Sequence, residues 1–192
     1  MTLIGSGAQN RMTNPYVPGS EWRIGDFVLF DGAGPTFSIL SWLLGRWDKD
    51  WKVLTRKPWH TGFLSRKDAN GDWWVGNSVG GVGPTETLLK DFKEPYLVFR
   101  WFETAPDEAA VAAFIAEHKG EKYDNFWGYV FVILWYFVPW WPLIIDHKFM
   151  CWEFLYLFAL QFGKPIDKVY RYPFITILMD KLGYPGYGEK NG

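Results

Sequence analysis

The stretch that decides the fold is WHTGFLSRKDANGDWWVGNSV, residues 59–79. Two runs rich in aromatic and β-branched residues, 59–64 and 72–79, flank a polar segment that contains Asn70-Gly71. An Asn-Gly pair between two such runs is a strong signal for a tight turn that joins antiparallel strands. The stretch therefore predicts an antiparallel β-hairpin.

Segments on either side of the hairpin predict further strands and helices. Strands are expected over 22–30 and 94–102, and helices over 36–47, 85–92, 105–119, 150–162 and 175–182. The helix at 105–119 begins with a proline and two acids, which suit its positive end, and Gly120 ends it. The predicted class is α+β, a small antiparallel sheet packed with helices. We assign 1–20 to an extended N-terminal arm, 21–168 to one domain, and 169–192 to an aromatic tail rich in glycine and proline.

Composition excludes several classes of protein. Aromatic residues make up 20% of the 192 residues, which is enough apolar surface to exclude disorder for most of the chain. The net charge is −1 and there is no basic run, so a nucleic-acid partner is not expected. A single cysteine excludes an internal disulfide and a cysteine-rich zinc site. The first residues lack an apolar core, so no signal peptide is expected.

Residues 126–145 form an aromatic insert without a charged residue. Their length matches one bilayer crossing, but Pro139, Pro142 and the many Trp and Tyr residues favour an interface over the membrane centre. We expect this segment to contact a membrane or a protein partner. The arm and the tail are further candidates for contacts within a protein assembly.

One cysteine and one histidine stand out as candidate catalytic residues. A lone cysteine is usually buried and inert, but Cys151 lies at the start of a predicted helix, where the positive end of the dipole lowers a thiol pKa. His60 begins a predicted strand, and Asn77 is a polar residue inside the next, largely apolar strand. A nucleophile, a base and a third group that orients the base form the arrangement of a catalytic triad.

The other histidines and motifs have simpler explanations. His118 ends a predicted helix, where we expect either a solvated side chain or a partner of the helix dipole. His147 is a rival base, disfavoured because a base normally comes from a separate element. The three histidines lack metal-ligand spacing, and we expect neither a metal nor a cofactor. The Trp pairs at 73–74 and 140–141 indicate packing or an interface, with sugar stacking as an open alternative.

Four short motifs follow one another in order between Trp22 and Gly163. They are Gly25-Asp26, His60-Thr-Gly62, Gly120-Glu-Lys-Tyr-Asp124 and Cys151-Trp-Glu153. In this order the chain resembles the permuted papain-like superfamily, whose relatives include NlpC-type cell-wall peptidases and lecithin:retinol acyltransferases. The resemblance implies a circularly permuted papain-like fold in which the histidine strand precedes the cysteine helix.

The resemblance also implies a role for each site residue. Cys151 is the nucleophile, His60 its general base, and Asn77 the group that aligns His60. The backbone N–H of Cys151, with Tyr123 nearby, stabilises the oxyanion, and Glu153 gives structural support.

The sequence departs from the superfamily's pattern at two places. Relatives commonly have a small residue after the cysteine, where this chain has the bulky Trp152. The aromatic insert before Cys151 is also unusual, and either feature could close the cleft.

Two classes of function follow from the sequence. The first is a cysteine amidase or peptidase that acts through a thioester, with bacterial cell-wall peptide as the leading substrate, or an acyltransferase that uses an acyl lipid. The second is a structural or interaction protein, such as a viral particle component, that keeps the fold with a weak or silent site. A location in a virion, in the cytoplasm or at a membrane is compatible with both.

Overall fold

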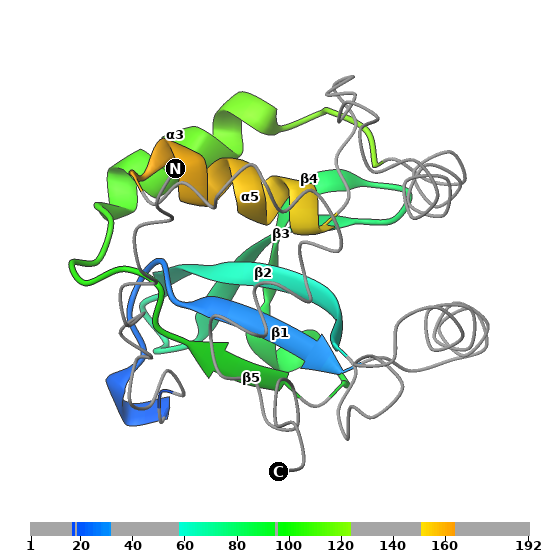
Figure 1. Cartoon of the computed structure of the whole chain (residues 1–192). Helices are drawn as coiled ribbons and strands as arrows, with labels where there is room; N and C mark the ends of the chain where they lie inside the picture. The colour runs from blue at the N-terminus through cyan, green and yellow to red at the C-terminus, as the bar shows by residue number, and fades with distance from the viewer. Residues whose placement is uncertain (1–16, 18, 32–57, 95, 124–150, 164–192) are drawn as a thin grey trace, which may run out of the picture.

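The computed structural model describes residues 17, 19–31, 58–94, 96–123 and 151–163 (Figure 1). This part of the chain contains five strands, two α-helices and two 3-10 turns: η1 (Gly19–Glu21), β1 (Phe27–Asp31), β2 (Pro58–Lys67), β3 (Trp73–Val79), β4 (Gly83–Leu88), η2 (Leu89–Asp91), β5 (Tyr96–Phe99), α3 (Glu108–His118) and α5 (Cys151–Gln161). The helix predicted over 36–47, the aromatic insert, His147, the tail and most of the arm lie outside the described residues.

The five strands form one sheet in the order β4-β3-β2-β1-β5, and each neighbouring pair is antiparallel. The predicted hairpin is confirmed, because β2 pairs with β3 and Gly62 lies opposite Asn77. Its turn is closed by the Asp68 carboxylate, which accepts hydrogen bonds from the backbone N–H groups of Asn70 and Asp72 at 2.9 and 3.0 Å. With two helices packed on this sheet, the predicted α+β class is confirmed.

The helix predicted over 85–92 is wrong. Residues 83–88 form β4, which pairs with β3 from Val79↔Gly83 to Trp74↔Leu88, and only Leu89–Asp91 make a 3-10 turn. Thr85 and Thr87 are β-branched and favour a strand, and the free edge of β3 supplies the hydrogen-bond partners that a strand needs.

Alternate residues of the strands build two apolar clusters, one on each face of the sheet. The helix-side cluster lies under α3 and α5, which cover the same face in Figure 1. Its buried members are Phe27, Leu29, Phe63, Phe99, Phe102, Val111, Phe114, Ile115, Phe154, Leu155, Phe158 and Ala159. The outer cluster, on the other face, consists of Val28, Phe30, Leu64, Val75, Leu89 and Val98.

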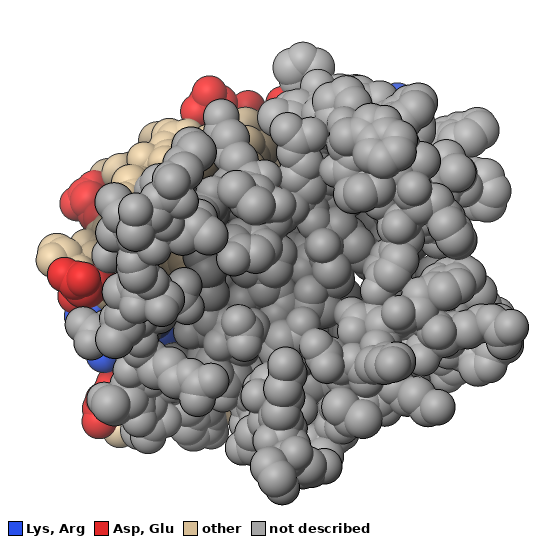
Figure 2. All heavy atoms as spheres, in the orientation of Figure 1, with Lys and Arg blue, Asp and Glu red and all other residues tan. Residues whose placement is uncertain are grey.

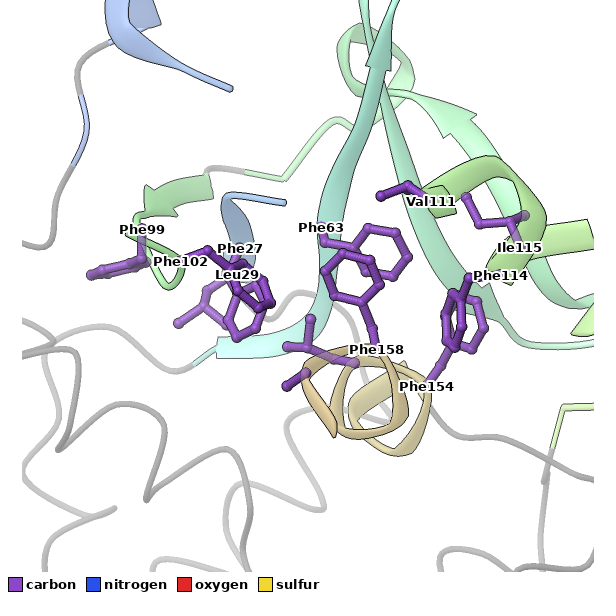
Figure 3. Close-up of a cluster of buried hydrophobic side chains, with 12 residues drawn as sticks. Phe27, Leu29, Phe63, Phe99, Phe102, Val111, Phe114, Ile115, Phe154 and Phe158 are labelled. Carbon is purple, nitrogen blue, oxygen red and sulfur yellow. The ribbon is translucent and has the colours of Figure 1, made fainter. Parts of the chain in front are cut away.

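Helix α5 is fixed to β2 by a stacked pair of rings. The rings of Phe63 and Phe158 are nearly parallel, with centroids 3.6 Å apart (Figure 3). Gly76 on β3 leaves room for the Phe63 ring, because a Cβ at this position would lie 2.5 Å from two of its atoms. Phe158 also meets Phe27 and Phe102, so the C-terminal half of α5 lies over the start of β1. The Cys151 end of the helix therefore points toward the end of β1 and the start of β2, as Figure 1 shows.

The Gly-Asp motif has a structural role at the entry to β1. Gly25 has a φ of 85°, and a Cβ here would lie 2.5 Å from Cδ of Pro106, so only glycine fits. Asp26 is buried, with 1% of its surface exposed, and its carboxylate accepts hydrogen bonds from the Arg100 side chain at 3.1 Å and the Arg23 backbone N–H at 3.0 Å. The motif thus joins β1 to the segment that follows β5.

The described end of the predicted arm packs on the edge of the sheet. Val17 is buried and its N–H donates to the carbonyl of Val98 on β5 at 3.0 Å. The Trp22 indole N–H donates in turn to the carbonyl of Val17 at 2.9 Å. These contacts tie the chain to the domain before η1 begins.

Candidate active site

Cys151 lies on a helix, as predicted, and is the first described residue of α5. Its side chain is 4% exposed, and Phe154, Leu155 and Phe158 on the following turns are also buried. Residues spaced by three, four and seven positions share one side of a helix, so Cys151 belongs to the side that faces the sheet. The sequence predicts a helix that begins at this point, and the start of a helix is a suitable place to bind an oxyanion.

His60 lies on β2, as predicted, but its ring belongs to the outer face of the sheet. It is paired with Phe30 in the register, and its ring centroid is 5.5 Å from that of Phe30 and 6.0 Å from that of Phe92. The ring keeps some exposure, yet this aromatic environment removes most of its hydration. Burial lowers the pKa of His60 to about 4, with the Glu94 carboxylate acting in the opposite direction. The imidazole is therefore neutral near pH 7 and only weakly basic.

Asn77 is fully buried on β3, opposite Gly62 and on the same face as His60. Among the described residues, neither its side-chain nitrogen nor its side-chain oxygen has a hydrogen-bond partner. Asn77 therefore makes no hydrogen bond to His60, the residue that it was expected to align. The two residues share a face because side chains alternate along strands, and Gly62 lies between His60 and Leu64 on that face.

Cys151 and His60, the candidate nucleophile and base, lie near the same end of the sheet but on its opposite faces. The side chain that β2 turns toward α5 at this end is Thr61, the neighbour of His60. Thr61 is buried, and its hydroxyl has no hydrogen-bond partner among the described residues. A proton that passes directly from Cys151 to His60 would have to travel around the end of the strand.

The supporting residues of the predicted site are only partly placed. Glu153 lies in the first turn of α5, where a carboxylate is stabilised by the positive end of the helix dipole. Tyr123 is half-buried in the segment after α3. The backbone of Trp152 is part of α5, but its side chain lies outside the described part of the structure.

A second histidine, which the sequence analysis set aside, lies on the face of the sheet that α5 covers. His118 ends α3 and its Nδ1 is 2.9 Å from Oε2 of Glu121, with the two side chains 17% and 22% exposed. Its ring meets those of Phe114 and Phe154 edge-on, with centroids 4.8 and 5.9 Å away. Of the two explanations expected for His118, the solvated side chain is wrong, because the residue continues the buried side of α3 by one turn. Its place in the last turn of α3 agrees with the other, an interaction with the helix dipole. The spacing of Phe114 and His118 could have revealed this.

Three further observations bear on the class of the protein. Within the described ranges, no three His, Cys, Asp or Glu side chains gather in a way that could hold a metal ion. None of the helices in those ranges is long and apolar enough to cross a membrane. No protein-family model matches the chain, and no curated protein matches it. The resemblance to the permuted papain-like superfamily therefore rests on the four motifs and their order.

Proposed function

We propose that the protein is a cysteine-nucleophile amidase or peptidase that works through a thioester. The observation that carries this proposal is the position of Cys151, buried in the first described turn of a helix that is stacked on the histidine-bearing strand. A thiol at a helix start can be activated, and the backbone N–H groups there can stabilise an oxyanion. The resemblance adds the substrate class, a bacterial cell-wall peptide, with acyl transfer from a lipid as the variant reaction.

In this reaction the Cys151 thiol loses its proton to a histidine and attacks the carbonyl carbon of the substrate. The resemblance gives the role of base to His60, aligned by Asn77, with Tyr123 at the oxyanion and Glu153 in support. The amine leaves with the proton that the histidine had taken, and water then releases the acyl group from sulfur.

A second candidate is a structural or interaction protein that keeps the fold with a weak or silent site, such as a viral particle component. Two observations favour it. His60 is a weak base on the face of the sheet opposite α5, and Asn77 makes no hydrogen bond to it. A chain selected for assembly has no need to hold these three side chains together.

Thiol chemistry separates the two candidates, since Cys151 is the only cysteine and a thiol reagent reports on it alone. We would measure the rate of alkylation by iodoacetamide against pH for the folded protein, with the urea-unfolded chain as the reference. The hydrolase proposal expects an apparent pKa well below the free-cysteine value of about 8.5. The midpoint of the profile decides the result, because steric shielding of the thiol slows the reaction without moving that midpoint.

An activated thiol should be followed by release of amino groups from cell-wall peptide, compared between the parent and Cys151→Ala at equal stability in urea. An ordinary thiol profile would refute the hydrolase and leave the interaction protein.

A further inference from the structure

We propose that His118, oriented by Glu121, is the base that serves Cys151. This inference rests on the proposed thiol chemistry and changes the residue that takes the proton. Three features of the described structure support it: the face of the sheet on which His118 lies, the contact of its ring with the first turns of α5, and the orientation that Glu121 imposes on the ring.

His118 and Cys151 lie on the same face of the sheet. Val111, Phe114 and Ile115 form the buried side of α3, and His118 extends this side toward the end of the helix. The positions of α3 that face away from this side, Ala112, Ala113 and Ala116 with Glu117 beside them, are exposed, and Figure 2 shows acidic side chains in this part of the described surface. His118 therefore points inward, toward α5.

The ring of His118 reaches the start of α5 through Phe154. Its centroid is 5.9 Å from that of Phe154, and the two rings are perpendicular. Phe154 follows Cys151 by three residues and lies on the same side of the helix. The imidazole thus stands beside the helical turn that carries the thiol. His60 is on the other face of the sheet, against Phe30.

Glu121 fixes the tautomer of His118. A carboxylate only accepts hydrogen bonds, so the hydrogen lies on Nδ1, 2.9 Å from the Glu121 oxygen. The lone pair is then on Nε2, the arrangement of a histidine base held by an acid. The Glu121 N–H donates to the carbonyl of His118 at 3.2 Å, which holds the two residues at this separation.

The segment that carries Glu121 is also held against β4. Gly83 has a φ of 91°, and a Cβ at this position would lie 2.0 Å from the Glu121 carbonyl oxygen. The backbone of Glu121 therefore passes directly over the first residue of β4, where only glycine leaves room for it. The carboxylate is thus presented from a fixed piece of backbone.

The proposed step is a transfer of the Cys151 proton from Sγ to Nε2 of His118. The sulfur then forms a bond to the carbonyl carbon of an amide, the carbon–nitrogen bond breaks, and the departing amine takes the proton from Nε2. Water attacks the thioester and gives a proton to Nε2, and this proton returns to the sulfur when the acid leaves.

The test is the alkylation of Cys151 by iodoacetamide against pH in the full chain, for the parent, His118→Gln, His118→Phe and Glu121→Gln, with Glu117→Gln as the matched surface control on α3. We expect His118→Gln and His118→Phe to raise the apparent thiol pKa toward about 8.5, and each unit by which this pKa rises above 7 lowers the rate near pH 7 by about tenfold. Glu121→Gln should give a smaller rise, and Glu117→Gln none. Unfolding in urea shows that each variant is folded.

The two His118 variants separate proton transfer from packing. Phenylalanine keeps a ring against Phe154 but cannot take a proton. If His118→Phe has the same alkylation rate profile against pH as the parent, His118 only packs against α5, and the inference is overturned. An unchanged profile in His118→Gln would overturn it as well.

If the inference is overturned, the alkylation profile of the parent protein decides whether the proposed function is kept. With an activated thiol in the parent, the hydrolase would stand, and His60→Gln would be the next variant to test. With an ordinary thiol in the parent, the hydrolase would fail together with the inference.

Discussion

Acid should destabilise the fold through His60. The folded protein holds the pKa of this side chain at about 4, against an ordinary value of 6.5, because burial among aromatic rings disfavours the charged form. The unfolded chain therefore binds a proton more readily than the folded protein between these two values. Stability from this group is complete above about pH 6.5 and is lost as the pH falls toward 4.

The magnitude follows from the difference between the two pKa values. Each unit corresponds to about 1.4 kcal/mol, so the loss is about 2 kcal/mol near pH 5 and reaches about 3 kcal/mol near pH 4. The exposure that the ring retains makes these values upper bounds, since water solvates part of the charged form.

Urea unfolding at about pH 7, 6 and 5, followed by tryptophan fluorescence, measures this loss. Carboxylates also titrate in this range, so the useful quantity is the difference between the parent and His60→Gln, which has no titratable group at this position. The parent should lose about 2 kcal/mol more than the variant between pH 7 and 5. Equal losses in the two proteins would refute a buried neutral histidine at this site.

Two further predictions concern the packing of α5 and of the segment after α3. Phe158→Ala removes the ring stacked on β2 and should lower the free energy of unfolding in urea by about 3–5 kcal/mol. Leu160→Ala, at an exposed position of the same helix, should change it by less than about 0.5 kcal/mol. Equal effects of the two substitutions would contradict the packing of α5 on the sheet. Gly81→Ala and Gly83→Ala both place a side chain at positive φ, at a cost of about 1–2 kcal/mol each. Only Gly83→Ala also collides with the Glu121 carbonyl, so it should be clearly less stable in thermal unfolding, and similar melting temperatures would show that this contact is loose.

Local patterns in the sequence predicted the elements of the fold well. The Asn-Gly turn predicted the hairpin, and the helix predicted over 150–162 is observed as Cys151–Gln161. The strand Gly83–Leu88 was missed because its hydrogen-bond partners lie on β3, and a short polar segment shows no apolar pattern that would reveal such pairing.

The faces of the sheet were harder to predict than its strands. A strand with one buried face shows a clear alternation of apolar and polar residues, but β2 has Phe63 buried on one face and Leu64 on the other. The sequence around His60 therefore does not indicate which face the ring occupies. The sequence also does not predict the contact between the His118 and Phe154 rings, because this contact depends on the packing of two helices that are distant in the chain.

The order of the strands has a consequence for how the chain folds. Strand β1 pairs on one side with β2 and on the other with β5, so that Phe27 lies beside Phe99. Such pairings between distant residues make folding slow. Of the described elements, α5 leaves the ribosome last, and until it docks, the phenylalanine side chains that α3 does not cover on this face of the sheet stay in water. A nascent chain that ends before Cys151 should therefore aggregate readily and require a chaperone.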